Sequence, residues 1–351
     1  PLATVPLHAL ADESRYAGLC ILEQGTTERI LLEAFQDAGG EVRFDHELTG
    51  VTQDGAGVVA TVRRGGSSTQ VRARYLAACD GASSTVREAL GLPFDGKTYD
   101  VDAVLADIRL PHMRNAAFPR VADDTNRLMF AVRLESGAWR MVSVERSGER
   151  RGSDVEPAEI HALEERLFGN RAGSIEWASR FRIHRRSVPR FRVGRVLLAG
   201  DAAHINSPAG AEGMNAAIHD AHNLAWKLAL ALRGGDEETL LESYHAERHY
   251  TNTKQVGGFT DRLTRTITAP KLLRRMAGRL AATALGVKPI RRRLLRRVMM
   301  ISNSYGASPL LHADAKHAGR RVPDVELAGA SGKRRLHDLL GLEPAIVSID
   351  V

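Results

Sequence analysis

The sequence predicts a mixed α/β protein in which a sheet with flanking helices is joined to a second, antiparallel sheet. Two buried apolar strands, at residues 75–79 and 195–199, each lead into a turn that holds an Asp beside a Gly, and a helix follows each turn. Residues 99–145 instead alternate apolar and polar side chains and hold no helical pattern, which indicates antiparallel strands. Strand, turn and helix units are typical of α/β folds, which bind ligands at the carboxyl ends of their strands.

The composition is that of an ordinary globular protein, with 351 residues of which 43% are apolar and 26% charged. This length predicts one large domain or two of medium size. Cys20 and Cys79 are the only cysteines, and they provide neither a disulfide framework nor a metal-ligand spacing. No apolar run is long enough to cross a membrane and no secretory signal opens the chain, so we expect a cytoplasmic protein without a metal site.

The net charge of +7 is concentrated in one segment. Ten of the 49 basic residues lie within residues 271–297, which hold no acid, so the other 39 are outnumbered by the 42 acids. Apolar residues recur there every three or four positions, and Gly286 and Pro289 divide the segment into two amphipathic helices. We favour a solvated basic face on helices packed against the main body over a contact with anionic lipid. Nucleic acid is not expected as a partner, because no aromatic side chains are interleaved to stack bases.

The first part of the chain is expected to begin with a helix at about residues 26–38, which two glycines end, followed directly by a strand. Residues 51–80 hold short alternating segments joined by glycine-rich turns, which predicts a small antiparallel insertion. After the Asp-Gly turn, Ser83 or Ser84 caps a short helix that ends at Gly91.

Longer helical patterns follow in the second half of the chain. They lie at residues 157–168, 213–232, 236–249 and 334–341. An apolar strand at residues 344–351 then stops at the last residue with no partner after it. Because the chain also starts at Pro1 rather than at a methionine, we interpret it as a fragment truncated at both ends.

The most informative stretch is GDAAHINSPAGAEGMN, residues 200–215, which places glycines and a proline directly before a long helix. Glycine is favoured where the backbone must approach another group closely or adopt a positive φ. A helix that begins there presents unpaired N–H groups to whatever lies in front of it. The stretch therefore predicts a bound ligand.

This stretch, with the following DAHNLAWKL, resembles the GD motif of the flavin-dependent aromatic hydroxylases, the group A flavoprotein monooxygenases related to para-hydroxybenzoate hydroxylase. CDGASSTVR, residues 79–87, resembles their DG motif. LEQGTTERILL resembles the segment in which a Gln precedes the long helix beside the cofactor. The order and spacing of these motifs extend the resemblance over about residues 15–300. The later segment GRRVPDVELAGASGKRRLHDLLG resembles the start of the C-terminal domain of the phenol-hydroxylase-like members.

The resemblance implies a domain organisation. An FAD-binding, Rossmann-like domain is expected to comprise residues 1–98, which include the small β insertion, and residues 191–305. Residues 99–190 would form an antiparallel-sheet substrate domain, and residues 306–351 the beginning of a thioredoxin-like domain. The sequence has no GxGxxG motif before a helix, so the family's N-terminal βαβ unit, which cradles the AMP and pyrophosphate of FAD, is expected to precede Pro1.

The resemblance implies that the glycine-rich stretch contacts the flavin end of FAD. Asp201, beside Gly200, would accept hydrogen bonds from the ribityl hydroxyls. The start of the following helix would face the pyrimidine edge of the isoalloxazine, where the helix dipole and free N–H groups stabilise the anionic reduced flavin. The residues implied to line the ring are Pro208, Gly210, Gly213, Met214 and Asn215.

The resemblance implies that CDGASSTVR and LEQGTTERILL contact other parts of the cofactor. Gln24 would contact FAD from the opposite helix. Asp80, Gly81 and Arg87 would lie near the FAD pyrophosphate and on the approach of NAD(P)H. A plain structural role competes with each assignment, for example a helix-surface position for Arg87.

Several neighbouring residues are expected to be structural. His204 should fix the loop and His219 should lie on a helix face, neither acting in catalysis. We expect Trp226 to pack a helix, Lys227 to be a solvated charge and Cys79 to lie in the core.

The sequence departs from the family at Ala211-Glu212, where many relatives have Gly-Gln. The change places a carboxylate near the flavin loop. Unless Glu212 points outward, it would weaken the stabilisation of an anionic flavin.

The resemblance implies an FAD-dependent monooxygenase that takes hydride from NADPH or NADH and reacts with O2 through a flavin C4a-hydroperoxide. Its substrate would be a small phenolic or polyketide-like aromatic, held under a roof formed by the second sheet. No residue is assigned as a catalytic acid or base. The oligomeric state is left open, a homodimer included.

Two alternatives remain open. The same fold hosts flavin-dependent halogenation and epoxidation, which turnover with and without halide would separate from hydroxylation. A truncated, non-catalytic remnant that binds no flavin would be colourless on purification.

Overall fold

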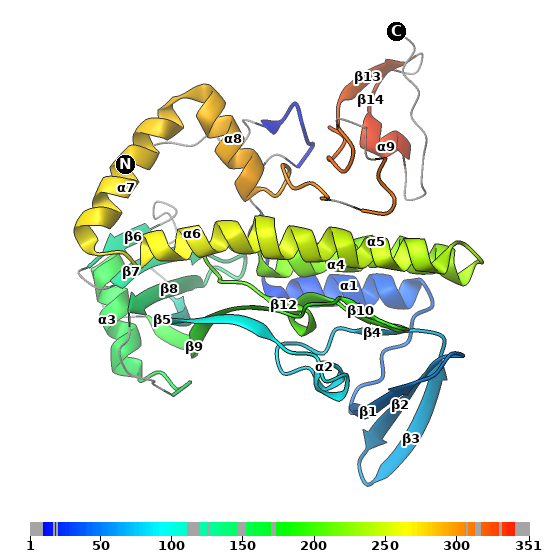
Figure 1. The fold of residues 1–351 in the computed structure, drawn as a ribbon. Coiled ribbons are helices and arrows are strands. Elements are labelled where there is room, and N and C mark those ends of the chain that lie inside the picture. The colour runs from blue at the N-terminus through cyan, green and yellow to red at the C-terminus, as the bar shows by residue number, and fades with distance from the viewer. Residues whose placement is uncertain are drawn as a thin grey trace.

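The computed structural model describes residues 10–16, 18, 20–110, 120–124, 127–146, 152–169, 173–306, 308–312, 317–329 and 332–340. A long layer of helices, α4 to α6, crosses the molecule (Figure 1). The six-stranded sheet, β5 to β9 with β12, lies under one end of this layer, and the sheet of β4, β10 and β11 lies under the other. Parallel and antiparallel pairs both occur, which confirms the predicted mixed α/β class. Among the described residues no helix is long and apolar enough to cross a membrane.

A small sheet with one parallel pair joins the two motif strands. β4 (Leu76–Ala78) pairs in parallel with β11 (Val196–Leu198), and β10 (Arg192–Val193) pairs with β11 from the other side in the opposite direction. All three residues of β11 are fully buried in a core that includes Phe191 and Tyr244. β4 lies at the edge of this sheet.

The edge position of β4 explains one incorrect prediction. Cys79, which follows β4 directly, is exposed rather than in the core. Alternate residues of a strand point to opposite faces, and Ala78 is buried while its neighbours Ala77 and Cys79 are exposed. Protein atoms nearby still desolvate the Cys79 thiol and raise its pKa.

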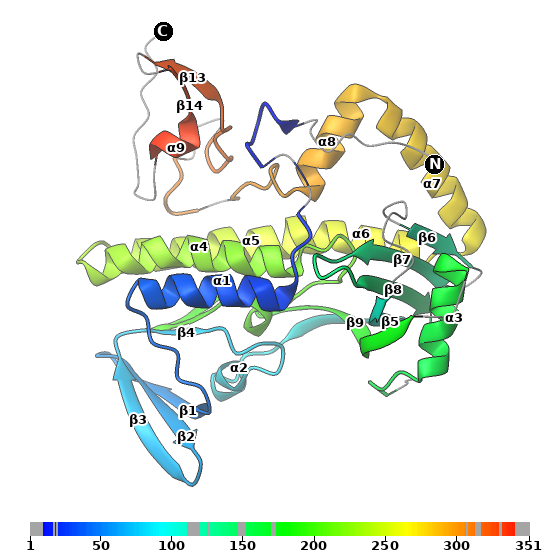
Figure 2. The ribbon, with the colours of Figure 1, turned by 180° about the vertical axis from the view of Figure 1, so that it is seen from behind.

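Helix α1 (Gln24–Asp37) begins close to the predicted position and runs alongside α4 (Figures 1 and 2). None of its residues is buried, and its large apolar side chains Ile30, Leu31 and Phe35 are about half exposed. The strand expected directly after it, at residues 41–44, is not formed. No strand among the described residues pairs with that segment, so its backbone has no ladder to join.

The small insertion is an antiparallel meander, as predicted. It consists of β1 (Glu47–Gln53), β2 (Val58–Arg64) and β3 (Ser67–Ala73). The helix of the DG motif, α2 (Thr85–Ala89), is capped by Ser84, whose Oγ accepts a hydrogen bond from the Arg87 N–H at 3.0 Å. Gly91 follows with φ of 62°, the left-handed conformation expected at the end of a helix.

The second sheet is antiparallel, as its alternating sequence predicts. Its strand order is β12, β9, β5, β8, β7, β6. Five of its strands are β5 (Asp95–Arg109), β6 (Arg120–Asp123), β7 (Arg127–Arg133), β8 (Trp139–Arg146) and β9 (Ser174–Ser187). Helix α3 (Pro157–Phe168), at the predicted position, covers one face and buries Ile160 and Leu163 against Trp139.

The sixth strand links this sheet to the glycine-rich stretch. β12 (His204–Ile205) follows the 3-10 helix η2 (Gly200–Ala202) and pairs with the end of β9. The sequence did not indicate this pairing, because two residues are too few for a periodic pattern. The motif segment is therefore part of the second sheet as well as of the parallel pair.

The main helices occur where they were predicted. α4 (Gly213–Leu232) and α5 (Glu237–Tyr250) pack side by side, and a π-helical turn, η3 (Thr251–Val256), continues α5 into α6 (Gly257–Ile267). π-Helical turns inside α-helices are frequently found at functional sites.

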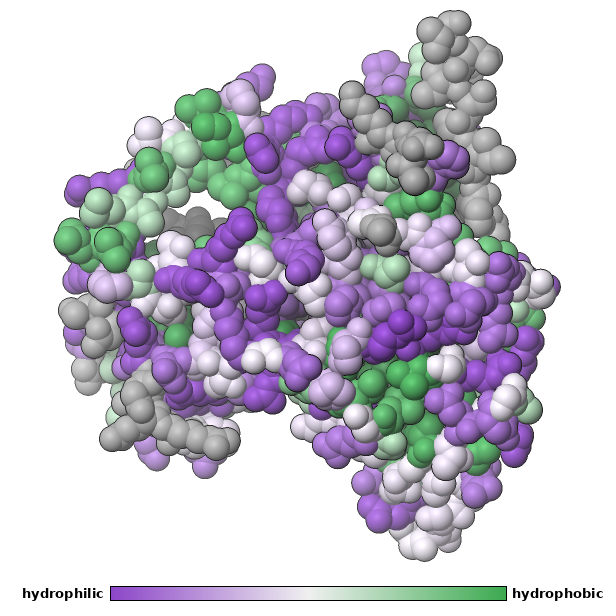
Figure 3. Space-filling model, viewed as in Figure 1, coloured by the Kyte–Doolittle hydropathy of each residue, from purple (hydrophilic) through white to green (hydrophobic). Residues whose placement is uncertain are grey.

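The basic segment forms the two predicted helices, α7 (Lys271–Gly286) and α8 (Lys288–Val298), but their packing differs from the prediction. Leu272, Met276 and Leu280 of α7 are 59–73% exposed, and apolar side chains gather on this part of the surface (Figure 3). Arg274 is buried instead, and its Nε donates to Asp123 Oδ1 at 3.0 Å. An ion pair, rather than the apolar stripe, holds α7 to the sheet.

The last described elements are β13 (Glu326–Gly329), β14 (Gly332–Arg335) and the predicted short helix, α9 (Leu336–Leu340). The apolar strand expected at residues 344–351 lies outside the described residues.

Candidate functional site

The parallel pairing of β4 with β11 brings the DG and GD motifs together. Leu76 is opposite Val196 and Ala78 is opposite Leu198, so both strands end at the same edge of the sheet. Asp80 follows one strand end and Asp201 the other. Gly81 has φ of 81° and Gly200 has φ of 59°, a conformation that L side chains rarely adopt.

Asp80 stabilises the DG turn. Its Oδ1 accepts a hydrogen bond from Ser84 Oγ at 2.5 Å, and its Oδ2 accepts one from the Val86 N–H at 3.0 Å. A carboxylate at this position complements the positive end of α2. Asp80 is nevertheless exposed at the strand end.

Arg87 joins the two motifs. Its guanidinium donates to the carbonyl of Ala82 at 2.6 Å and to the carbonyl of Ala202 at 3.2 Å, and it lies 4.0 Å from the centre of the Phe94 ring. The side chain is 6% exposed. Arg87 therefore holds the DG turn against η2.

Asp201 presents an open acceptor. The residue is exposed, and within the described part of the chain its carboxylate accepts no hydrogen bond. The protein atoms around it partly desolvate the carboxyl group and raise its pKa, an effect that His204 opposes. A carboxylate of this kind can accept hydrogen bonds from the hydroxyls of a ligand.

The loop before α4 exposes the start of that helix. The first i to i−4 bond of α4 runs from the Ala216 N–H to the carbonyl of Glu212 at 2.9 Å. The N–H groups of Gly213, Met214 and Asn215 donate to no backbone carbonyl outside the helix among the described residues, as expected for a first turn. Met214 and Asn215 are exposed, so these donors are open to a ligand.

The glycine of this loop is required by its backbone conformation. Gly210 has φ of 102°, and a Cβ there would lie 3.4 Å from the ring of Phe259 on α6. Pro208, two residues earlier, is exposed. The backbone of the loop therefore lies open on one side and packed on the other.

A buried carboxylate fixes this segment from behind. Asp220 of α4 is fully buried and accepts hydrogen bonds from the Gly200 N–H at 3.0 Å, from Arg248 Nε at 2.7 Å and from Asn252 Nδ2 at 3.0 Å. Its Oδ2 also lies 2.6 Å from His204 Nε2. Burial alone would raise the pKa of Asp220, but His204 and Arg248 together lower it to about 2. His204 therefore fixes the loop, as expected.

A second buried ion pair continues the network along the same helices. Lys227 Nζ lies 2.6 Å from Glu247 Oε2 and donates to Asn223 Oδ1 at 2.9 Å. Lys227 is fully buried, so its prediction as a solvated charge is wrong. A signal was present in the sequence, because Asp220, Asn223 and Lys227 are spaced along one face of a helix.

Glu212 points inward rather than outward. Its carboxylate is 1% exposed and pairs with Arg297 of α8, with Oε1 and Nη1 separated by 3.0 Å. Burial raises the pKa of Glu212 to about 7, and Arg297 acts in the opposite direction.

Gln24 lies at the start of α1, apart from these residues. It is exposed, and its Nε2 donates to Glu28 Oε1 at 2.8 Å. The preceding Glu23 accepts a hydrogen bond from the Ser136 N–H at 3.0 Å, which ties the start of α1 to the second sheet.

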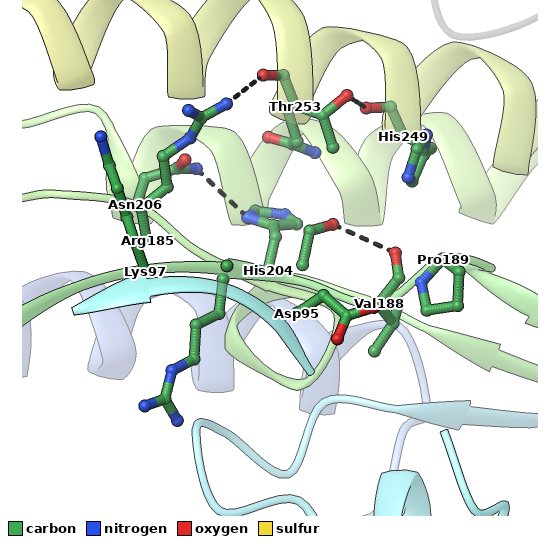
Figure 4. Close-up of a pocket in the computed structure, with 13 residues that line it drawn as sticks. Asp95, Lys97, Arg185, Val188, Pro189, His204, Asn206, His249 and Thr253 are labelled. Carbon is green, nitrogen blue, oxygen red and sulfur yellow. Dashed lines mark hydrogen bonds between the residues drawn. The ribbon is translucent and has the colours of Figure 1, made fainter. Parts of the chain in front are cut away.

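A cavity of about 520 Å³ lies between the sheet and the helix formed by α5 and η3 (Figure 4). The start of β5, the end of β9 and β12 supply its floor, and Arg185 reaches across to donate to the carbonyl of Thr253 at 2.7 Å. Its lining is mainly cationic or neutral and polar, with Lys97, Arg185, Arg186, His204 and His249 against a single acid, Asp95. Apart from His204, these residues belong to no sequence motif, because they come from four separate elements.

Comparison with known proteins gives a consistent result. A family model described as "FAD binding domain" matches residues 4–257. The rifampicin monooxygenase of Streptomyces venezuelae is 32% identical over 340 residues, which cover 94% of this chain and 68% of that protein. The 12-dehydrotetracycline 5-monooxygenase/anhydrotetracycline 6-monooxygenase of Streptomyces rimosus is 32% identical over 360 residues, covering 95% and 67%.

Solved structures agree. The anhydrotetracycline hydroxylase OxyS from Streptomyces rimosus superimposes with a TM-score of 0.77 at 32% identity, covering 95% of this chain and 66% of that one. The chain spans only 53% of another relative, a flavin-dependent monooxygenase of Mycobacteroides abscessus, to which it is 34% identical.

Proposed function

The chain belongs to the FAD binding domain family that includes the FAD-dependent aromatic monooxygenases, and we propose that it acts with FAD, NAD(P)H and O2 to hydroxylate a phenolic or polyketide-like aromatic compound. The observation that carries the proposal is the segment from Gly200 to Asn215. It combines the open carboxylate of Asp201 with the free N–H groups at the start of α4, and the buried carboxylate of Asp220 holds it in place.

The residues present fit FAD. Asp201 would accept hydrogen bonds from the ribityl hydroxyls, since its carboxylate has no partner in the described chain. The backbone of Pro208 and Gly210 would lie against the ring. The N–H groups of Gly213, Met214 and Asn215 would donate to its pyrimidine edge, where a helix start favours negative charge.

The DG side would complete the cofactor site. Asp80 and Gly81 are proposed to lie beside the pyrophosphate, on the approach of NAD(P)H. Arg87 would act there by holding the DG turn against η2, because its guanidinium already donates to two carbonyls. Gln24 is proposed to contact the cofactor from α1.

When bound, FAD would supply the redox chemistry, in which NAD(P)H reduces O2, one oxygen atom goes to the aromatic ring and the other leaves as water. The protein's part is to bind, orient and exclude water. We propose that residues 99–190 form the substrate domain, with the six-stranded sheet as the roof of the pocket, and that residues 1–98 and 191–305 bind FAD. Residues 306–351 would begin a thioredoxin-like domain.

The proposal is tested first by FAD titration followed through flavin fluorescence. Asp201→Asn keeps an acceptor oxygen but removes the charge that strengthens its hydrogen bonds, and the loss of about 1–1.5 kcal/mol predicts roughly fivefold to tenfold weaker binding. Asp45→Asn is the matched control, because Asp45 is exposed and Asn tolerates its φ of 59°. Equal affinity of both variants for FAD would contradict the assignment of Asp201.

The reaction class is tested by supplying phenolic and polyketide aromatics with NADPH or NADH under O2. Hydroxylated product is expected, with the added oxygen derived from labelled O2. Product that forms only with halide, or NAD(P)H oxidation that no aromatic accelerates, would contradict hydroxylation.

A further inference from the structure

We propose that Arg297 is a positioning residue for the flavin, which acts by holding and neutralising Glu212 beneath the loop that begins α4. This inference rests on the proposed function, because it concerns the charge that the loop presents to FAD. It adds a residue from the basic helix α8, which none of the motifs includes.

The ion pair is built into three elements. Arg297 Nη1 lies 3.0 Å from Glu212 Oε1, and Nη2 donates to the carbonyl of Gln255 in η3 at 2.6 Å. The guanidinium stacks 4.3 Å from the centre of the Phe259 ring on α6. Because these contacts fix the guanidinium in position and orientation, it acts as a rigid support under the loop.

The ion pair lies under the part of the loop in which two successive residues have a positive φ. Ala211, next to Glu212, has φ of 54°, and Gly210 has φ of 102°. Phe259, on which Arg297 stacks, is also the nearest side chain to the position of a Cβ on Gly210. Ala211 adopts a conformation that is costly for a residue with a side chain, and such conformations persist where the surroundings hold them.

The charge of Glu212 matters because of its place at the N-terminus of a 20-residue helix. An unpaired carboxylate there would offset the positive potential that the N–H groups of Met214 and Asn215 present to an anion. Arg297 is the charged group that faces Glu212 from α8, while Gln255 and Phe259 on the other neighbouring elements are neutral. With the pair intact, the helix start keeps its positive character.

The test is the midpoint potential of bound FAD measured from pH 6 to 10, because a potential reports charge next to the flavin and not packing alone. In Arg297→Gln, Glu212 ionises without a partner at high pH and disfavours the anionic reduced flavin. The ratio of reduced to oxidised flavin affinity should fall about tenfold at pH 10, which is about 30 mV for a two-electron couple. The difference from the unmodified chain should be smallest just above pH 7, where Glu212 is ionised only when Arg297 pairs with it. It should return toward pH 6, where protonation of Glu212 leaves Arg297 uncompensated in the unmodified chain.

Four further variants complete the design. Glu212→Gln should raise the potential, since it leaves Arg297 uncompensated, and Glu212→Gln/Arg297→Gln should return it close to the original value. Arg297→Lys keeps the charge and should rescue most of the loss. Arg296→Gln is the matched control, because Arg296 belongs to the same helix but pairs with Glu13 at 2.9 Å.

The outcomes separate the two proposals. FAD that fails to bind the unmodified chain contradicts the proposed function and, with it, this inference. FAD that binds with a potential that Arg297→Gln and Glu212→Gln leave unchanged, or shift in the same direction, overturns the inference alone. Amide hydrogen exchange of residues 209–215 in the free chain gives a second readout, with faster exchange expected in Arg297→Gln but not in Arg296→Gln.

Discussion

The two sides of the candidate flavin site are built differently. On the side of α4 and α5, Asp220 and Lys227 are fully buried, and each is paired with a charge from α5. On the side of α1 no residue is buried, and Leu31 is 55% exposed. The residues of the GD segment therefore rest on a rigid support, whereas Gln24 lies on a helix with few buried contacts. The difference predicts where substitutions will be costly.

The largest effect is expected at the centre of the buried network. Asp220→Ala leaves Arg248 and His204 buried without their carboxylate, and removal of one partner from a buried pair costs about 3–5 kcal/mol. Urea unfolding measures this loss. A loss below about 1 kcal/mol would show that the α4 side is no better supported than the α1 side.

A somewhat smaller loss is expected for the second pair. Lys227→Met leaves Glu247 buried and unpaired and should destabilise the chain by about 3 kcal/mol. The double variant Lys227→Met/Glu247→Gln should recover part of that loss, because no uncompensated charge remains. Equal stability of Lys227→Met and the double variant would mean that an unpaired, buried Glu247 costs nothing, which would contradict this account.

Acid should weaken the α4 side selectively. The folded pKa of Asp220, about 2, lies below its ordinary value of 3.8, so its stabilisation is present above about pH 4 and is lost as the pH falls toward 2. The lost stability is about 2 kcal/mol. The free energy of unfolding of the unmodified chain and of Asp220→Asn, measured from pH 5 to pH 2, isolates this contribution. The difference between the two free energies should become smaller at low pH, and a constant difference would contradict the account.

The smallest effect is expected on α1. Leu31→Ser replaces a half-exposed apolar side chain and should change the free energy of unfolding by less than about 0.5 kcal/mol. Thermal or urea unfolding checks this value. A loss of 2 kcal/mol or more would show that α1 is packed in solution and would remove the contrast between the two sides.

The same contrast explains which helices and strands could be predicted from the sequence. Periodic patterns located α3 and α4 at their observed bounds and divided α7 from α8, because long helices are set by local spacing. The two-residue strand β12 carries no such pattern and depends on pairing with β9. The strand expected at residues 41–44 did not form, because no strand of the described residues lies beside it to pair with.

Site residues follow a similar rule. Asp201 and the residues near the start of α4 could be named because they belong to one contiguous motif. Arg297 could not, since its partner lies 85 residues away along the chain and only the folded structure brings the two together. For Lys227 the sequence showed the polar helix face that it shares with Asn223, but not its ionic partner Glu247, which lies 20 residues away. Cys79 was misplaced because an apolar strand predicts burial, and the sequence does not tell whether that strand lies at a sheet edge.

The central claim is that the start of α4 and the turn before it receive FAD. Amide hydrogen exchange of the chain with and without FAD tests it most directly. The account predicts slower exchange at residues 213–215 and at residues 200–202 when FAD is added, with little change across β1 to β3. FAD that binds while these amides exchange at an unchanged rate, or an absence of binding altogether, would contradict it.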